Sequence, residues 1–273
     1  MNNYISNNEL SLTILILSCQ KYSDIWSNNL FLLDKHWPNH PNVMLISDGM
    51  GTFDLINPKE LIVIDKEASS RLIDALSNIQ TEFVLLTFDD YFVNKRVNSE
   101  AIDNILNIMD SQQFDYCRLY KNKKVRGRFI GMLRYKMLPL KEVYEVNFYP
   151  SIWKKNSLAS VLKDNEDIWK TEVRLTRRMR ENQKKGIAIY NKNIFPFIDC
   201  IRKGKYLRPA YRFLIKNNMF ISNRQVRTIR ETTKLAIQTF VSDHSPIFLK
   251  RFIKTKMSKK GAVFYSDFEN SDD

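Results

Sequence analysis

Residues 81–93, TEFVLLTFDDYFV, decide the fold of this chain. Residues 83–88 form a short, unbroken apolar run with Val and aromatic side chains, which ends abruptly at Asp89 and Asp90. Such a run, without polar alternation, is typical of a strand buried on both faces of a parallel sheet. In open α/β sheets the ligand lies beyond the carboxyl ends of the strands. The sequence therefore predicts a ligand site at this pair of carboxylates.

Two interpretations of Asp89 and Asp90 follow from the chemistry of carboxylates. They bind a divalent cation that also holds phosphate oxygens, because hard cations prefer both kinds of ligand. Alternatively, they cap a helix or bend a turn. Burial without a partner is excluded, since it is too costly. From these two residues alone, both interpretations stay open.

The segments before this stretch predict the start of a doubly wound sheet. Three further apolar runs read as strands, at residues 12–18 (LTILILS), 42–47 (NVMLIS) and 60–65 (ELIVID). Apolar residues recur at helical spacing over residues 24–37 and 69–79, the latter with Ser69 or Ser70 as a candidate cap. Later strands are expected at residues 115–120 and 186–190, and a charged helix at 171–181. This order predicts an α/β fold with helices flanking the sheet.

Composition bounds the class of protein. In 273 residues, 44% are hydrophobic and 12% aromatic, which excludes disorder over most of the chain. There is no run of 18 apolar residues and no secretory-signal pattern, so we expect a cytoplasmic protein. The three cysteines are isolated, which suits a reducing compartment and argues against disulfides or a cysteine zinc site.

The formal charge of +13 is concentrated in one segment. Residues 202–260 hold 16 Lys and Arg against two acids, whereas residues 261–273 hold four acids and no base. We therefore expect three regions: a catalytic-looking domain over 1–205, a basic helical extension over 206–260, and an acidic, frayed tail over 261–273. Within the extension, helices are predicted at residues 211–221, 225–241 and 246–257.

The basic extension has three alternative partners. An anionic membrane surface fits basic amphipathic helices and would keep the protein peripheral on the inner face of the membrane. Packing on the core, or a homo-oligomer through the same helices, would leave a solvated basic face. Nucleic acid is not expected, because no recognition module or set of base-stacking aromatics is found.

Three segments together carry a resemblance to a known family. They are residues 12–26 (LTILILSCQKYSDIW), 69–92 (SSRLIDALSNIQTEFVLLTFDDYF) and 149–172 (YPSIWKKNSLASVLKDNEDIWKTE). As a set they resemble bacterial glycosyltransferases of the GT-A fold, which act in capsule, exopolysaccharide and lipopolysaccharide synthesis. The resemblance covers about residues 10–205 and implies a GT-A-like, Rossmann-type mixed sheet.

The resemblance implies a donor site for a nucleotide-diphosphate sugar. FDDYF matches the place of the metal-binding D-x-D motif, so Asp90 is expected to bind Mn²⁺ or Mg²⁺, and Asp89 the ribose or the metal. The paired spacing departs from D-x-D, so a metal-independent enzyme stays an alternative. Further residues are expected at the base, ribose or diphosphate: Ser18, Lys21, Tyr22, Asp48, Arg71 and Lys205. For Arg71, a solvated helix position is the open alternative.

The resemblance also implies a general base on the acceptor side, in a pattern like W-x-x-E. Glu172 is the first choice and Asp167 the second, and an acid at a helix N-terminus is the alternative for either. Trp153 and Trp169 are candidates for a sugar platform or for the core. The implied function is sugar transfer to a hydroxyl of a glycan or lipid-linked acceptor. A non-catalytic scaffold of a polysaccharide assembly complex is the alternative.

Overall fold

The structure is a computed structural model that describes residues 11–51, 61–120, 129–130, 135–190, 194–233 and 236–237. The chain divides into two compact units, Met1–Phe197 and Ile198–Asp273, which are described separately below. The first unit holds the sheet and its helices. The second unit begins within β11 (Phe197–Asp199) and continues into the basic extension.

Two parallel strands, β1 (Leu12–Leu17) and β4 (Phe83–Phe88), form the centre of the first unit. Their register pairs Leu12 with Phe83 and Leu17 with Phe88, so the two strands end side by side. All of their residues are buried except Phe88, which is half-buried. The prediction of a strand buried on both faces at the stretch before Asp89 is confirmed.

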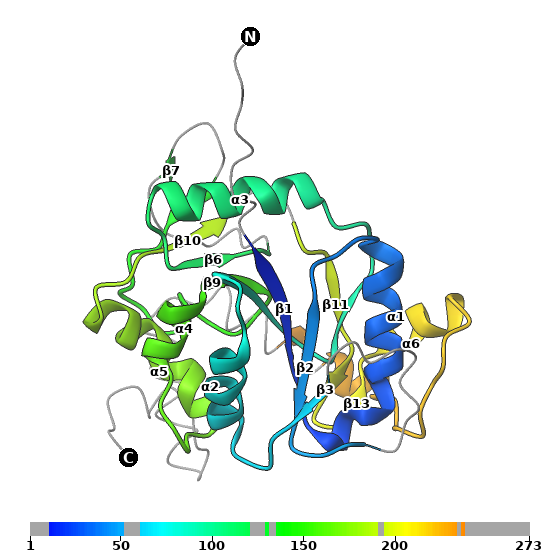
Figure 1. Ribbon diagram of the computed structural model, residues 1–273. Coiled ribbons are helices and arrows are strands. Elements are labelled where there is room, and N and C mark those ends of the chain that lie inside the picture. Colours follow the sequence, from blue (N-terminus) through cyan, green and yellow to red (C-terminus); the bar gives the residue numbers. More distant parts are fainter. Residues whose placement is uncertain are drawn as a thin grey trace. The chain divides into compact units, whose positions relative to one another are not determined.

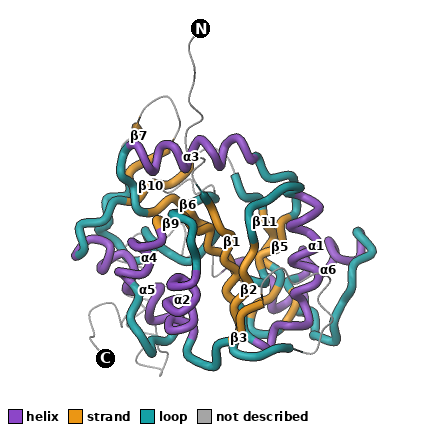
Figure 2. Tube along the Cα trace, viewed as in Figure 1, coloured by secondary structure: helices purple, strands orange, loops and turns teal. Residues whose placement is uncertain are grey.

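A nine-stranded mixed sheet extends from this pair, in the order β3-β2-β1-β4-β9-β6-β10-β8-β7 (Figures 1 and 2). The other strands are β2 (Val43–Ser47), β3 (Leu61–Val63), β6 (Tyr116–Arg118), β7 (Phe129–Ile130), β8 (Tyr135–Met137), β9 (Ser151–Lys154) and β10 (Gly186–Ile189). Strand β9 is antiparallel to both β4 and β6, so β6 runs in the same direction as β4. The carboxyl ends of β1, β2, β4 and β6 therefore lie on one edge of the sheet.

Helices cover both faces of the sheet, as predicted. Alternate residues of β1 and β4 point into two separate cores. One core is closed by α1 (Trp26–His36) and α3 (Ser99–Ser111). The other is closed by α2 (Ala68–Asn78), α4 (Lys155–Val161) and α5 (Ile168–Glu181), which group together in Figure 1. A 3₁₀ helix, η1 (Gln20–Ile25), leads into α1, and a short strand, β5 (Tyr91–Val93), follows β4.

The second unit starts with a hairpin of β12 (Ile201–Arg202) and β13 (Lys205–Tyr206), which turns at Gly204 with a φ of +73°. The predicted domain boundary after residue 205 falls inside this hairpin. Tyr206 pairs with Ile201 and also bridges to Val226, which ties this strand to the chain that follows it. The hairpin therefore belongs with the extension and not with the sheet domain.

The helices of the extension differ from the predictions. Helix α6 spans Arg208–Lys216, with Pro209 in its first turn, so it begins and ends before the predicted 211–221. Residues 225–228 are not helical, and helix is found at 229–233 and 236–237. The predicted helix at 246–257 and the acidic tail lie outside the described residues. No helix among the described residues is both long and apolar enough to cross a membrane.

Candidate active site

A hydrogen-bonded pair joins the ends of the two central strands. Ser18 and Asp89 directly follow the paired residues Leu17 and Phe88. The hydroxyl of Ser18 donates to Oδ2 of Asp89 and accepts from Nε1 of Trp26 at 2.6 Å. Trp26 Nε1 also lies 3.4 Å from the same carboxylate oxygen. The structure thus brings together two predicted donor-site residues and adds Trp26, which the sequence reasoning assigned only to an apolar helix face.

The turn that carries Asp89 and Asp90 is held by a buried amide. Nδ2 of Asn29, on α1, donates to the carbonyl of Asp89 at 2.8 Å and to that of Tyr91 at 3.3 Å. Asp90 is half-buried at the tip of this turn. Sequence reasoning missed Asn29, although its position three residues after Trp26 and four before Leu33 places it on the apolar face of α1. A polar residue on such a face signals a buried hydrogen-bonding role.

Arg71 is not a solvated helix residue, because only 6% of its surface is exposed. From the first turn of α2, Nη2 donates to the Ser18 carbonyl at 3.1 Å, and Nη1 donates to the Lys66 carbonyl at 2.8 Å. Nη1 also lies 3.4 Å from Oδ2 of Asp48, whose other oxygen accepts from the Gln20 amide at 2.6 Å. Arg71 Nε is buried without a hydrogen-bond partner among the described residues. Ser18, Asp48, Arg71 and Asp89 therefore form one contiguous group.

The other predicted donor residues lie less centrally. Lys21 is exposed and Tyr22 half-buried on η1, directly after Ser18 and Cys19. Lys205 lies in the second unit, where its amine forms an ion pair with Glu231 at 3.0 Å. Nothing in the structure tests their contact with a donor, so these assignments stay predictions.

Glu172 is linked to the end of β4 through Phe148. Its Oε1 accepts from the amide of Phe148 at 3.1 Å, and the Phe148 ring meets the Phe88 ring edge-on with centroids 6.4 Å apart. Burial raises the pKa of Glu172 above its ordinary value, and the amide hydrogen bond opposes that rise. A carboxylate with a raised pKa suits proton abstraction near neutral pH.

Asp167 is the N-cap of α5. Its side chain accepts from the amides of Trp169 at 2.9 Å and Lys170 at 3.1 Å, which satisfies two of the free amides at the start of the helix. The capping alternative is therefore confirmed for Asp167. Because the side chain is also exposed, its second role as a base stays a prediction.

The two predicted platform tryptophans have opposite environments. Trp153, on β9, is 0% exposed; its Nε1 donates to Ser151 and its ring packs on Tyr116. The platform assignment for Trp153 is therefore wrong, because a sealed ring cannot contact a sugar. Trp169 is 56% exposed at the start of α5, so its assignment stays a prediction.

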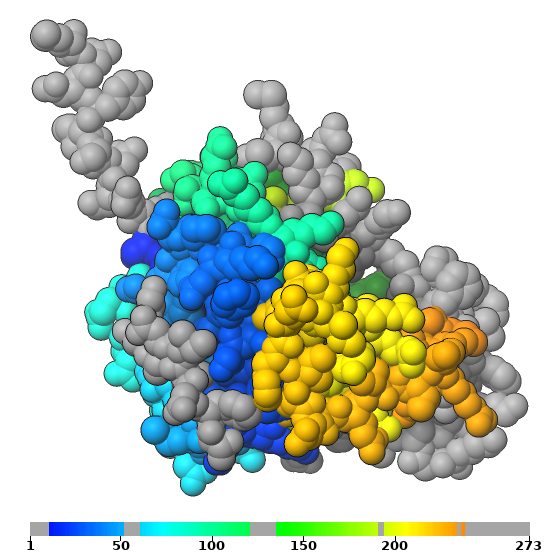
Figure 3. All heavy atoms as spheres, turned by 90° about the vertical axis from the view of Figure 1, so that its right-hand side faces the viewer, coloured from blue at the N-terminus to red at the C-terminus, as the bar shows by residue number. Residues whose placement is uncertain are grey.

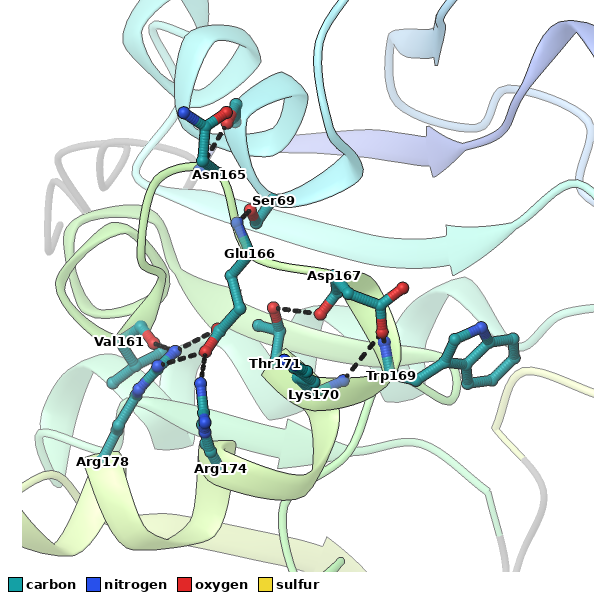
Figure 4. A network of polar contacts seen from close by, with 11 residues as sticks. Ser69, Val161, Asn165, Glu166, Asp167, Trp169, Lys170, Thr171, Arg174 and Arg178 are labelled. Atoms are coloured by element: carbon teal, nitrogen blue, oxygen red, sulfur yellow. Dashed lines mark hydrogen bonds and ion pairs between the residues drawn. The ribbon is translucent and has the colours of Figure 1, made fainter. Parts of the chain in front are cut away.

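A buried ion cluster fixes the loop before Asp167 (Figure 4). The carboxylate of Glu166 accepts from Arg174 and is gripped by both terminal nitrogens of Arg178 at 2.7 Å. Figure 4 shows Glu166 directed toward the two arginines, whereas Trp169 points to the opposite side. Burial alone would raise the pKa of Glu166, but the hydrogen bonds from Arg178 and Arg174 outweigh it and lower that pKa.

The same loop is attached to the first turn of α2. Ser69 accepts from the amide of Glu166 at 2.8 Å, and Ser70 accepts from that of Asn165 at 2.9 Å. Ser70 also donates to Asp164. The prediction that Ser69 or Ser70 caps α2 is wrong: the N-cap is Glu67, which makes no side-chain capping bond. The two serines instead join the loop of the candidate base to the helix of Arg71.

The metal-binding capacity of the site rests on two carboxylates. The described residues contain no group of three His, Cys, Asp or Glu side chains able to hold a metal ion. Mg²⁺ is commonly held by one or two carboxylates together with substrate phosphates. Asp89 and Asp90 fit a cation shared with a diphosphate, and they do not form a protein-only cage. Asp90 stays the first candidate ligand and Asp89 the alternative, and Oδ2 of Asp89 is hydrogen-bonded to Ser18.

We expect Glu166→Gln to destabilise the fold by about 3–5 kcal/mol, because it leaves the buried guanidinium of Arg174 and the half-buried one of Arg178 without their counter-charge. The measurement is denaturant unfolding, with Glu181→Gln as the matched control. Glu181 is exposed and pairs only at 3.7 Å with Arg177, so its loss should cost under about 0.5 kcal/mol. Since the pKa of Glu166 is lowered, the difference between wild type and variant should shrink as the pH falls below 4.5. Equal stability of the two variants at pH 7 would contradict the assignment.

No protein-family model matches the chain, and no curated protein does. Among solved structures, S. aureus TarS 1–349 in complex with UDP-GlcNAc gives a TM-score of 0.49 at 15% identity, over 72% of this chain and 60% of that one. Another S. aureus TarS structure gives a TM-score of 0.44 at 14% sequence identity, over 68% of this chain and 36% of that one. A CMP:2-keto-3-deoxy-manno-octonic acid synthetase in complex with CTP gives a TM-score of 0.43 at 10% sequence identity. This match covers 77% of this chain and 100% of that one. The chain spans at most 60% of the length of these TarS structures. The site described above is argued only from contacts within this chain.

Proposed function

We propose that this protein is a glycosyltransferase that moves a sugar from a nucleoside-diphosphate donor to an acceptor hydroxyl. The observation that supports this most is the contiguous group of Ser18, Asp48, Arg71 and Asp89. It lies where the strand order reverses between β1 and β4, and open α/β sheets bind their ligands at such switch points.

Each member of the group has a role that its chemistry suits. Arg71 is buried, held by two carbonyls and close to Asp48, so it places a fixed positive charge beside the Ser18 carbonyl that would attract a diphosphate. Asp48 and Asp89 provide acceptors for ribose or base. A divalent cation held by Asp90, with Asp89 as the alternative ligand, would offset the charge that develops on the diphosphate leaving group.

The acceptor side is assigned to the residues around α5. Glu172 takes the proton of the attacking hydroxyl in our first assignment, and Asp167 in the second. Trp169 offers an exposed ring for an acceptor sugar. We extend the proposal to a glycan or lipid-linked acceptor in bacterial surface polysaccharide synthesis, with the enzyme in the cytoplasm.

The second unit is proposed to bind an anionic membrane surface. Its described residues include exposed apolar side chains beside exposed cations: Ile215 (50% exposed) lies next to Lys216 and near Arg212 on α6. Figure 3 shows this part of the surface in yellow and orange. Apolar and cationic side chains on one short helix fit a headgroup layer.

Asp90→Asn should remove the metal-dependent part of nucleotide binding, because it deletes the candidate ligand and keeps the side-chain shape. The measurement is calorimetric titration of nucleotide sugars carrying uridine, guanosine, thymidine or cytidine, with Mn²⁺ or with EDTA. We expect wild type to bind its donor at least about tenfold more tightly with Mn²⁺, and the variant to lose this gain. Asp103→Asn, at an exposed position on α3, is the control. Tight binding in EDTA by both proteins would reject the metal assignment.

Glu172→Gln should keep donor binding and lower the transfer rate by about 10²- to 10⁴-fold, the usual contribution of a general base. Because burial raises the pKa of Glu172, the acidic limb of the wild-type rate should have its midpoint above pH 4.5. Rates and pH profiles of Glu172→Gln and Asp167→Asn decide between the two residues. If only Asp167→Asn loses activity, the base is Asp167. If a bound donor is neither hydrolysed nor transferred by wild type, the scaffold alternative is supported.

Reversing two charges on α6, Arg212→Glu with Lys216→Glu, should weaken binding to vesicles of graded phosphatidylserine content by roughly tenfold or more. Each cation near such a surface contributes about 1 kcal/mol. Co-sedimentation at low and high salt is the measurement, since salt screens this attraction. A matched control reverses Lys35 and Lys163, which are exposed in the first unit. Equal sedimentation of the two variants would reject the membrane proposal, and a change in oligomeric mass would favour packing through α6.

A further inference from the structure

Arg118 and Tyr120 lie on the same sheet edge as the candidate active site, where no role has been assigned to them. Arg118 is the last residue of β6. Ser151 of β9 pairs with both Arg118 and Leu86, so Arg118 is level with Leu86 on β4. Asp89 follows Leu86 by three residues along the same strand direction. The chain leaving β6 therefore emerges at the same edge as the turn that carries Asp89 and Asp90, with the start of β9 between them.

Arg118 is a buried cation without a carboxylate in ion-pair contact among the described residues. It is 4% exposed, and its Nε has no hydrogen-bond partner there. Nη1 donates to the hydroxyl of Tyr120 at 3.2 Å, and the guanidinium lies 5.3 Å from the centre of the Tyr120 ring. Glu145 acts on the charge of Arg118 from a greater distance. A purely structural buried arginine would be paired, because an uncompensated buried charge is strongly unfavourable.

The hydroxyl oxygen of Tyr120 accepts two hydrogen bonds from within the protein. It accepts from Arg118 and also from Nδ2 of Asn147 at 3.3 Å. The orientation of Asn147 is fixed, because its Oδ1 accepts from the amide of Tyr149 at 3.2 Å and its Nδ2 also donates to the Tyr144 carbonyl at 3.1 Å. With two donors directed at its oxygen, the hydroxyl proton of Tyr120 must be donated elsewhere. No acceptor for it is found among the described residues, and Tyr120 is half-buried, so part of its surface is open to solvent.

Aromatic rings continue from Tyr120 toward the candidate active site. Tyr149 lies with its centroid 4.9 Å from that of Tyr120, and Tyr91 stacks on Tyr149 at 5.4 Å with an interplanar angle of 17°. Tyr91 directly follows Asp90, and Tyr149 directly follows Phe148, whose amide binds Glu172. These half-buried tyrosines and Phe197, which contacts all three, form one aromatic cluster, called the wall below, that joins the segment after Asp90 to the segment after Phe148.

We propose that Tyr120, supported by Arg118 and Asn147, forms a subsite for an anionic group on the acceptor. The group is a phosphate or a carboxylate, and the sugar that bears it contacts Tyr149 beside Tyr120. An O–H donor with a cation behind it favours oxygens that accept hydrogen bonds and carry negative charge. The identification of the ligand as an acceptor rests on the proposed function. The binding of an anionic group at Tyr120 can be tested without any donor.

The test is fluorine NMR of the full chain labelled with 3-fluorotyrosine, titrated with glucose 6-phosphate, glucuronic acid and glucose. The signal of Tyr149, assigned by a Tyr149→Phe variant, reports binding at the wall and not at Arg71. We expect the phosphate or the carboxylate probe to bind at least about tenfold more tightly than glucose, the usual effect of one hydrogen bond to a charged group. The tighter of the two anionic probes identifies the class of group.

Tyr120→Phe removes only the hydroxyl and should abolish the preference for the charged probe. Tyr211→Phe is the matched control, because this tyrosine is half-buried like Tyr120 but lies on α6, where its ring contacts Tyr206; it should keep the preference. Arg118→Gln should reduce the preference for the charged probe as well. If Arg118→Gln does not fold, the Tyr120→Phe result alone tests the subsite.

Equal binding of charged and neutral probes at Tyr149, no shift with any probe, or an unchanged preference in Tyr120→Phe would each overturn the subsite. Nucleotide-sugar titrations on the same samples separate this result from the proposed function. A Tyr120-dependent preference without donor binding would reject the glycosyltransferase and keep the anion subsite.

Discussion

The pairing of β1 with β4 is the constraint on which the rest of the first unit depends. Because these strands run parallel and in register, they end together. The residues that directly follow them, Ser18 and Asp89, therefore lie next to each other. The Ser18–Asp89 hydrogen bond forms at that meeting point, and α1 closes over it with Trp26 and Asn29. Buried polar groups at a strand end must be satisfied within the protein or by a ligand. Here the protein satisfies one oxygen of Asp89 and positions Asp90 beside it.

Helix α2 joins the two sides of the site. Its first turn carries Arg71 toward the Ser18 carbonyl, and its serines bind the loop that leads to Asp167. Glu166 fixes the same loop to α5 through Arg174 and Arg178. These contacts fix the position of Arg71 relative to the start of α5 within the protein itself, and a site built on such connected elements is preorganised.

Local patterns predicted the sheet domain well, because apolar runs and helical periodicity depend on neighbours in sequence. The buried strand before Asp89 and the amphipathic segment of α2 were both found in this way. Contacts between distant segments could not be read in the same manner. Ser70 is a natural capping residue by composition, yet its hydroxyl bonds a loop 95 residues away. Trp153 was open between sugar platform and core, and only the register of β9 between β4 and β6 places it inside. The extension was harder still, since its hairpin and bridge to Val226 have no periodic signal.

The antiparallel strand β9 has a geometric consequence for substrate choice. It separates β4 from β6, so the ends of those strands are two strand spacings apart, or about 10 Å. The residues proposed to meet the donor follow β1 and β4, whereas Arg118 ends β6 and Tyr120 follows it. The separation between these two groups of residues is thus built into backbone hydrogen bonding and does not depend on any side chain. Under the proposed function, replacing the side chains after β6 would alter the acceptor side and leave the residues of the donor side in place.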